Sequence, residues 1–118
     1  MDDLQKLKTA MHNFAVERDW LQFQTPKNLV MALAGETGEL LECFQWLTPE
    51  QSENLTPEQR LAVADEIADI QLYLVRLADS LELDIYTECS RKMQLNAVKY
   101  PAQLVRGSSK KYTQYKLD

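Results

Sequence analysis

The sequence contains few of the residues that several common kinds of catalytic site require. Of its 118 residues, one is histidine, two are cysteine and three are glycine. Because His12 is the only histidine and forms no recognisable motif with a serine or cysteine, a nucleophilic triad is not predicted. No glycine-rich phosphate-binding loop is present either, so any phosphate group would have to be held in another way.

Long apolar runs and a disulfide framework are also missing. No run approaches the roughly 20 apolar residues of a membrane-spanning helix, and the charged start MDDLQKLKTA is unlike a signal peptide. We therefore expect a cytoplasmic protein without a membrane partner. In that compartment Cys43 and Cys89 are predicted to be free thiols.

Positive charge is scarce over most of the chain. Residues 1–98 hold 8 Lys and Arg against 17 Asp and Glu, whereas residues 99–118 hold 5 against 1. An acidic body repels the phosphates of DNA and RNA, so a nucleic acid polymer is not an expected partner. The basic end is either a solvated tail or a segment that neutralises the body or binds a small phosphorylated ligand.

What the sequence does contain is helical periodicity, with no strictly alternating stretch to indicate a sheet. Thr25-Pro26 and Thr56-Pro57 are typical helix starts. The pattern predicts an all-α chain forming a single domain, a four-helix bundle with short connections and enough apolar positions for a helical dimer or larger assembly. The predicted helices cover residues 2–18, 26–46, 57–81 and 84–98, and an irregular tail covers residues 99–118 of the single domain 1–118.

Two pairs of acidic residues stand among apolar neighbours on the second and third predicted helices. Glu36 and Glu39 lie in GETGELLECFQW, and Glu66 and Asp69 lie in DEIADIQLY, each pair at i, i+3 on one helix face. If the two helices are antiparallel, four carboxylates converge and must take up protons or bind cations. An all-oxygen ligand set favours a hard cation such as Mg²⁺ or Mn²⁺. Such pairs are also common on solvated helices, so both interpretations stay open.

Two aromatic residues are expected on the same faces as these carboxylates. Trp46 follows Glu36 by ten residues and Tyr73 follows Glu66 by seven, which corresponds to nearly three and two helical turns. Their rings could stack on a nucleobase or fill the core of the bundle.

The acidic motif and the segments around it resemble the MazG-like superfamily of all-α NTP pyrophosphohydrolases, in its dCTP pyrophosphatase branch. The similar segments occur in order along nearly the whole chain: ERDWLQF, GETGELLECFQW, EIADIQLYLVRLAD, KMQLNAVKYP and RGSSKKYT. The resemblance implies a helical bundle that assembles as a homodimer or a dimer of dimers. It also implies Mg²⁺-dependent hydrolysis of a nucleoside triphosphate, dCTP or a modified dCTP, to the monophosphate and pyrophosphate.

The resemblance also assigns roles to individual residues. Glu39 would orient or deprotonate the attacking water, as one of four carboxylates that form the catalytic centre and hold the metal: Glu36, Glu39, Glu66 and Asp69. Substrate binding would involve Trp20 and Trp46 around the base and three residues at the sugar or phosphates: Tyr73, Lys92 and Asn96.

One departure from the family pattern concerns the base pocket. The family carries a histidine three residues before the position of Phe14, whereas this chain has Met11 there and His12 one residue along. That difference leaves dATP or dUTP open as alternative substrates of the same reaction. A non-catalytic helical interaction module is a further alternative.

Overall fold

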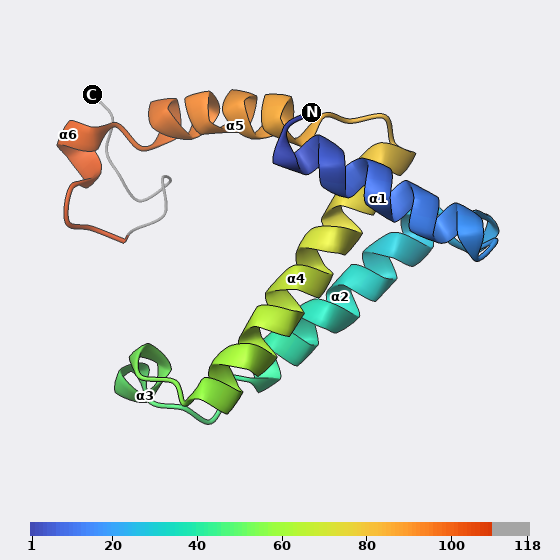
Figure 1. Cartoon of the computed structure of the whole chain (residues 1–118). Coiled ribbons are helices and arrows are strands. Elements are labelled where there is room, and N and C mark those ends of the chain that lie inside the picture. The colour runs from blue at the N-terminus through green and yellow to red at the C-terminus, as the bar shows by residue number, and fades with distance from the viewer. Residues whose placement is uncertain (110–118) are drawn as a thin grey trace. The chain divides into compact units, whose positions relative to one another are not determined.

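The computed structural model describes residues 1–109, in which helices are the only regular secondary structure. The all-α prediction is therefore confirmed, while the part of the predicted tail that begins at Lys110 lies outside the described residues. Within the described part, no helix is both long enough and apolar enough to span a membrane. The elements, labelled in Figure 1, are α1 (Asp3–Glu17), the 3₁₀ helix η1 (Leu21–Phe23), α2 (Pro26–Glu42), α3 (Pro49–Glu53), α4 (Pro57–Ser80), α5 (Ile85–Lys99) and α6 (Ala102–Val105).

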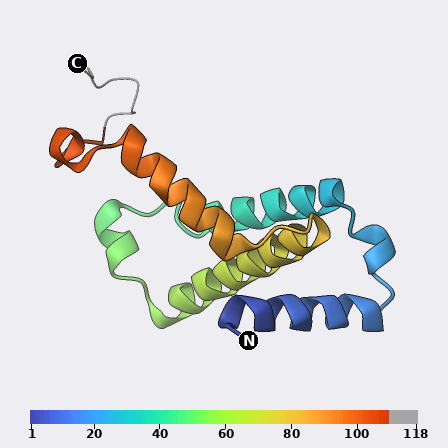
Figure 2. The same ribbon diagram turned by 90° about the horizontal axis from the view of Figure 1, so that it is seen from above.

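The chain divides into two compact units, residues 1–83 and the segment that begins at Asp84. In the first unit α2 and α4 run antiparallel side by side, and α1 packs against α4, so that α4 lies between its two neighbours (Figure 2). Each of these helices contributes one buried apolar residue: Ala15, Leu29 and Val75. The second unit contains α5 and α6. A single four-helix domain remains a prediction.

Threonine caps set the starts of α2, α3 and α4. The hydroxyl group of each cap accepts a hydrogen bond from a backbone N–H of the first helical turn, and a proline follows each threonine. At Thr48 and Thr56 the side chains of Gln51 and Gln59 return to the backbone N–H of the cap, which completes a capping box. The predicted starts at Pro26 and Pro57 are confirmed.

The second helix is shorter than predicted: α2 ends at Glu42, whereas the sequence predicted an end at residue 46. Thr48 precedes a proline and is held extended (φ −74°, ψ 160°), so the chain has to leave the helix before it. Between Glu42 and Thr48 the backbone forms turns, in which the N–H of Phe44 donates to the carbonyl of Leu41 at 3.0 Å. Short helices α3 and α6 also form where a loop and an irregular tail were predicted.

The C-terminal ends of α1 and α4 share one geometry, the Schellman motif. Asp19 and Glu82 adopt positive φ angles of 54° and 57° just beyond their helices. The N–H of the next residue then donates to the carbonyl five residues earlier, at 2.9 Å after α1 and 2.8 Å after α4. Glycine usually occupies this left-handed position, but both helices end within one residue of the predicted ends at residues 18 and 81.

Candidate metal centre

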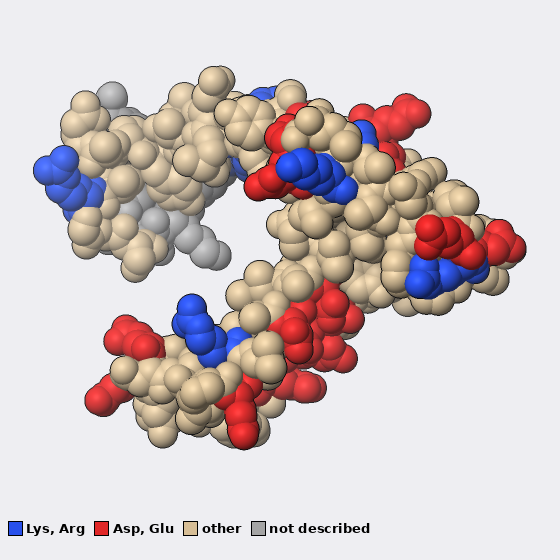
Figure 3. Space-filling view, viewed as in Figure 1, with Lys and Arg blue, Asp and Glu red and all other residues tan. Residues whose placement is uncertain are grey.

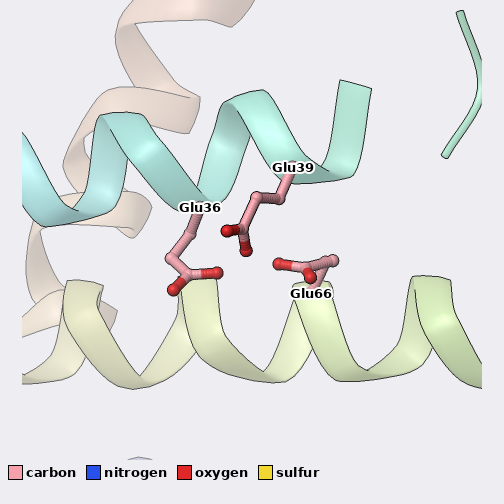
Figure 4. Close-up of side chains that lie close together, drawn as sticks. All are labelled: Glu36, Glu39 and Glu66. Carbon is pink, nitrogen blue, oxygen red and sulfur yellow. The ribbon is translucent and has the colours of Figure 1, made fainter. Parts of the chain in front are cut away.

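Three acidic side chains converge in the space between α2 and α4. Glu36 and Glu39 extend from α2 and Glu66 extends from α4, with their carboxylate groups turned toward one another (Figure 4). One carboxylate oxygen from each residue lies within 4.8 Å of the other two. We call these three residues the carboxylate cluster. The antiparallel packing of α2 and α4 produces it, because the middle of one helix then lies beside the middle of the other.

Asp69, the fourth acidic residue of the motif, is not part of the carboxylate cluster. It lies on α4 one turn beyond Glu66, where it is exposed. Its negative charge nevertheless acts on the cluster and contributes to the raised pKa of both Glu36 and Glu66. In the space-filling view, acidic side chains gather over the paired α2 and α4 helices (Figure 3).

Crowding of the carboxylates changes their proton affinity. A hydrogen bond with Glu66, burial, and the hydrogen bond and charge of Glu39 together raise the pKa of Glu36 from 4.5 to about 7. At Glu66 the hydrogen bond with Glu36 lowers the pKa, but burial and the negative charges of Glu39 and Asp69 outweigh it, so the pKa of Glu66 is raised as well. In the absence of a cation, a proton on Glu36 relieves the repulsion within the cluster.

The donor atoms of the carboxylate cluster suit a hard divalent cation. Glu36 Oε2 and Glu66 Oε2 are both buried, and as ionised groups neither has a hydrogen-bond partner. Buried carboxylate oxygens without a donor are costly unless a positive charge compensates them. In octahedral Mg²⁺ coordination, oxygens on opposite sides of the ion are about 4.2 Å apart, which is comparable to the spread of these three side chains. The residues present therefore fit Mg²⁺ or Mn²⁺.

The aromatic residues lie in different places. Tyr73 is half-buried on α4, two turns beyond Glu66 as predicted. Trp46 does not follow the helical face of Glu36, because α2 has already ended; its side chain lies in the turn before α3 and is 87% exposed. Trp20 lies in the turn after α1 and is 45% exposed.

The two remaining predicted substrate residues belong to the second unit. Lys92 and Asn96 lie one turn apart on α5, so they share one face of that helix. Lys92 is exposed and Asn96 is half-buried.

His12 faces the C-terminal half of α4 and takes no part in the carboxylate cluster. Its Nδ1 atom lies 3.9 Å from Oδ2 of Asp79, and the same oxygen accepts a hydrogen bond from the buried guanidinium group of Arg76. The contact joins α1 to α4.

Arg18, which no motif in the sequence indicated, packs against an aromatic pair at the end of α1. Its guanidinium carbon lies 3.5 Å from the centre of the Phe14 ring, and that ring meets Trp20 edge to face with the centroids 5.8 Å apart. The i, i+4 spacing of Phe14 and Arg18 on a helix is the signal that could have revealed the contact.

Comparisons with known proteins agree with these features. The sequence profile of the MazG-like family matches residues 32–115, which include both acidic pairs. Human dCTP pyrophosphatase 1 is 42% identical over 116 residues, which are 97% of this chain and 66% of the relative. The cattle protein of the same name is 43% identical over 115 residues, with 96% and 66% covered. This chain thus spans 66% of the length of these relatives.

A solved structure is similar as well. The crystal structure of a pyrophosphatase from Archaeoglobus fulgidus superposes with a TM-score of 0.80 at 34% sequence identity, covering 86% of this chain and 94% of that chain. The family resemblance inferred from the acidic motif and its flanking segments is therefore confirmed. The helical fold, the acidic pairs on α2 and α4 and the match over residues 32–115 agree: the chain belongs to the MazG-like family.

Proposed function

We propose that this protein is a Mg²⁺-dependent nucleoside triphosphate pyrophosphohydrolase, which converts dCTP or a modified dCTP to the monophosphate and pyrophosphate. The observation that carries the proposal is the carboxylate cluster of Glu36, Glu39 and Glu66 between α2 and α4. Relatives named dCTP pyrophosphatase 1, at 42% and 43% identity, support both the reaction and the base.

The metal is proposed to be held by the carboxylate cluster together with Asp69, and Mn²⁺ is a possible substitute for Mg²⁺. A bound cation of this kind lowers the pKa of water and neutralises charge on phosphate oxygens. Glu39 is the exposed member of the cluster, so we assign it to orient or deprotonate the attacking water. The chain has to position water and phosphate in line, since phosphoryl transfer depends chiefly on positioning and charge neutralisation.

The substrate residues are proposed from the family resemblance. Trp20 and Trp46 would enclose the base, and both present exposed ring surface for stacking. Contacts to the sugar or phosphates are assigned to Tyr73, Lys92 and Asn96. Met11 at the base pocket is the reason to test dATP and dUTP beside dCTP.

A homodimer or a dimer of dimers is the proposed assembly, and the cytoplasm is its proposed location. Large apolar side chains lie exposed on α2 and α4 of the single chain, among them Met31 at 62%, Leu61 at 64% and Ile67 at 54%. Surfaces of this kind on paired helices are typical of interfaces between copies of a protein.

The reaction can be tested by incubating the protein with Mg²⁺ and a panel of canonical and modified nucleoside triphosphates, followed by anion-exchange analysis. We expect monophosphate and pyrophosphate, most rapidly from cytosine deoxynucleotides. If a nucleotide with another base gave the same products, the proposed reaction would stand and the pocket around Met11 would have a different base specificity. Diphosphate with free phosphate would refute the proposed bond cleavage, and no turnover would favour the interaction module.

A matched pair of variants tests the site within the same helical turn. Glu66→Gln removes a member of the carboxylate cluster and should reduce kcat by at least about 100-fold, the effect of removing strong electrostatic stabilisation. Asp65→Asn removes the exposed neighbouring carboxylate and should leave kcat within about twofold. Equal losses in the two variants would indicate a general effect of acidic charge and not a metal centre.

A further inference from the structure

The chain folds back on itself at the end of α1. Asp19, with its φ of 54°, reverses the direction of the chain, and the N–H of Trp20 donates to the carbonyl of Ala15 at 2.9 Å. In a Schellman motif the residue after the turn commonly makes an apolar contact with the last turn of the helix. Here that contact joins Trp20 to Phe14. Backbone geometry therefore brings the indole ring to Phe14 but leaves the orientation of the two rings to their side-chain contacts.

Arg18 makes the contacts that hold the Phe14 ring. Its guanidinium carbon lies 3.5 Å from the ring centre, and its Nη1 atom donates to the carbonyl of Phe14 at 3.1 Å. Phe14 meets Trp20 edge to face, with an interplanar angle of 66°. A planar guanidinium group stacks on an aromatic face in a way that the ammonium group of lysine does not. Arg18 over the face of Phe14, and Phe14 edge to face with Trp20, thus form a continuous series of contacts, which we call the α1 stack.

The competing interaction of Arg18 is weak. Its Nη1 atom lies 3.5 Å from Oε2 of Glu17, and both side chains are substantially exposed. Ion pairs between exposed side chains contribute little, because water and salt screen them. Arg18 contacts Phe14 twice, through the hydrogen bond to its carbonyl and through the face of its ring, so Phe14 positions the guanidinium group more than the screened ion pair with Glu17 does.

We propose that Arg18 is a positioning residue for base recognition, which acts on Trp20 through Phe14. The inference rests on the proposed function, in which Trp20 stacks on the base of the nucleotide. Trp20 keeps 45% of its surface exposed, so part of the ring remains available to a ligand after the α1 stack has formed. A platform that is already oriented binds a base without the loss of side-chain freedom that a mobile ring would suffer.

The first experiment measures the orientation of Trp20 without any turnover. The chain has two tryptophans, so Trp46→Phe leaves Trp20 as the only tryptophan, whose emission is excited selectively at wavelengths that tyrosine does not absorb. In that background we expect Arg18→Met to raise the acrylamide quenching constant by at least about 1.5-fold, because Phe14 loses its cation–π contact. Arg18→Lys keeps the charge without the planar group, so its quenching constant should lie between those of the Trp46→Phe background and of Arg18→Met. Arg60→Met, on exposed α4 surface, is the control and should change nothing. An unchanged quenching constant in Arg18→Met would overturn the proposal.

The second experiment separates base recognition from phosphate binding, with tryptophan retained at position 46. For the nucleotide that the parent protein prefers, Arg18→Met should raise KM by roughly three- to tenfold and leave kcat within about twofold. Inhibition by tripolyphosphate, which has no base, should keep its Ki. An unchanged KM, or equal increases in KM and in the Ki of tripolyphosphate, would overturn the role in base recognition. Absence of turnover in the parent would refute the proposed function itself, and quenching would still decide whether Arg18 orients Trp20.

Discussion

Glu36 shows most directly what happens when three carboxylates meet between two helices. Its pKa rises to about 7 because a hydrogen bond with Glu66, burial and the neighbouring charge of Glu39 all favour the protonated form. A cation and this proton are two ways of compensating the same cluster of negative charge. The stability of the metal-free protein should therefore depend on pH.

The sign of that dependence follows from the raised pKa. The folded chain binds the Glu36 proton more tightly than the unfolded chain does, so its stabilising contribution is complete below pH 4.5 and is lost as the pH rises through about 7. In EDTA, we expect the free energy of unfolding in urea to fall between about pH 5 and about pH 7.5. Glu36→Gln should remove most of this slope, and a variant that kept the full slope would contradict the assignment. Mg²⁺ should stabilise the parent most at the higher pH.

Glu82 allows a second prediction for a single residue. A left-handed conformation costs a side chain with a Cβ atom about 1–2 kcal/mol, whereas glycine loses roughly 0.5–1 kcal/mol more backbone entropy on folding. Because Glu82 has a φ of 57° and is exposed, Glu82→Gly should raise the free energy of unfolding by about 0.5–1 kcal/mol in urea denaturation. Glu82→Ala keeps the Cβ atom and should bring no gain. A gain of equal size in both variants would point to the removed charge instead.

At the scale of the helix, two nearly identical segments provide an internal comparison. Thr48 and Thr56 each begin a Thr-Pro-Glu-Gln capping box, but the first starts the five-residue α3 and the second the 24-residue α4. Thr56→Ala should lower the free energy of unfolding by about 1 kcal/mol, since it uncaps the helix that packs against both α1 and α2. Thr48→Ala should cost less than half as much, as measured by urea denaturation. Equal costs would mean that α3 contributes to global stability as much as α4 does.

These capped helices are also where the sequence was most informative. The starts at Pro26 and Pro57 follow from the strong local preference of threonine and proline for the first helical positions. The convergence of Glu36 with Glu66 followed from their positions on two antiparallel helices.

The end of α2 and several side-chain contacts were less accessible from the sequence. The end of α2 at Glu42 comes four residues before the predicted end, because the chain already forms turns ahead of the cap at Thr48, whereas α1 and α4 end within one residue of their predicted ends. The separation of Asp69 from the carboxylate cluster depends on the relative rotation of α2 and α4, which an i, i+3 pattern does not specify. Local propensity therefore located the helices, and packing determined which side chains meet.

At the scale of the whole molecule, the amount of exposed apolar surface on α2 and α4 leads to a prediction about assembly. Met31→Asp places a charge on an apolar position that is 62% exposed in the single chain. If a second copy covers α2, this variant should dissociate the assembly, seen as a lower sedimentation coefficient. Lys27→Asp changes a position on the same helix that is already charged and should leave sedimentation unchanged. An unchanged assembly in Met31→Asp would remove this part of α2 from the interface.

The capping box at Thr56 also bears on how this chain tolerates changes in length. Because α4 carries its own start signal, its first turn does not depend on how the chain arrives from α2. Closing a flexible connection costs only about 0.6 kcal/mol more for each doubling of its length. Insertions between Leu47 and Leu55 should therefore leave Glu66 opposite Glu36, so this connection is where the chain can grow, in evolution or by engineering, while the carboxylate cluster is preserved.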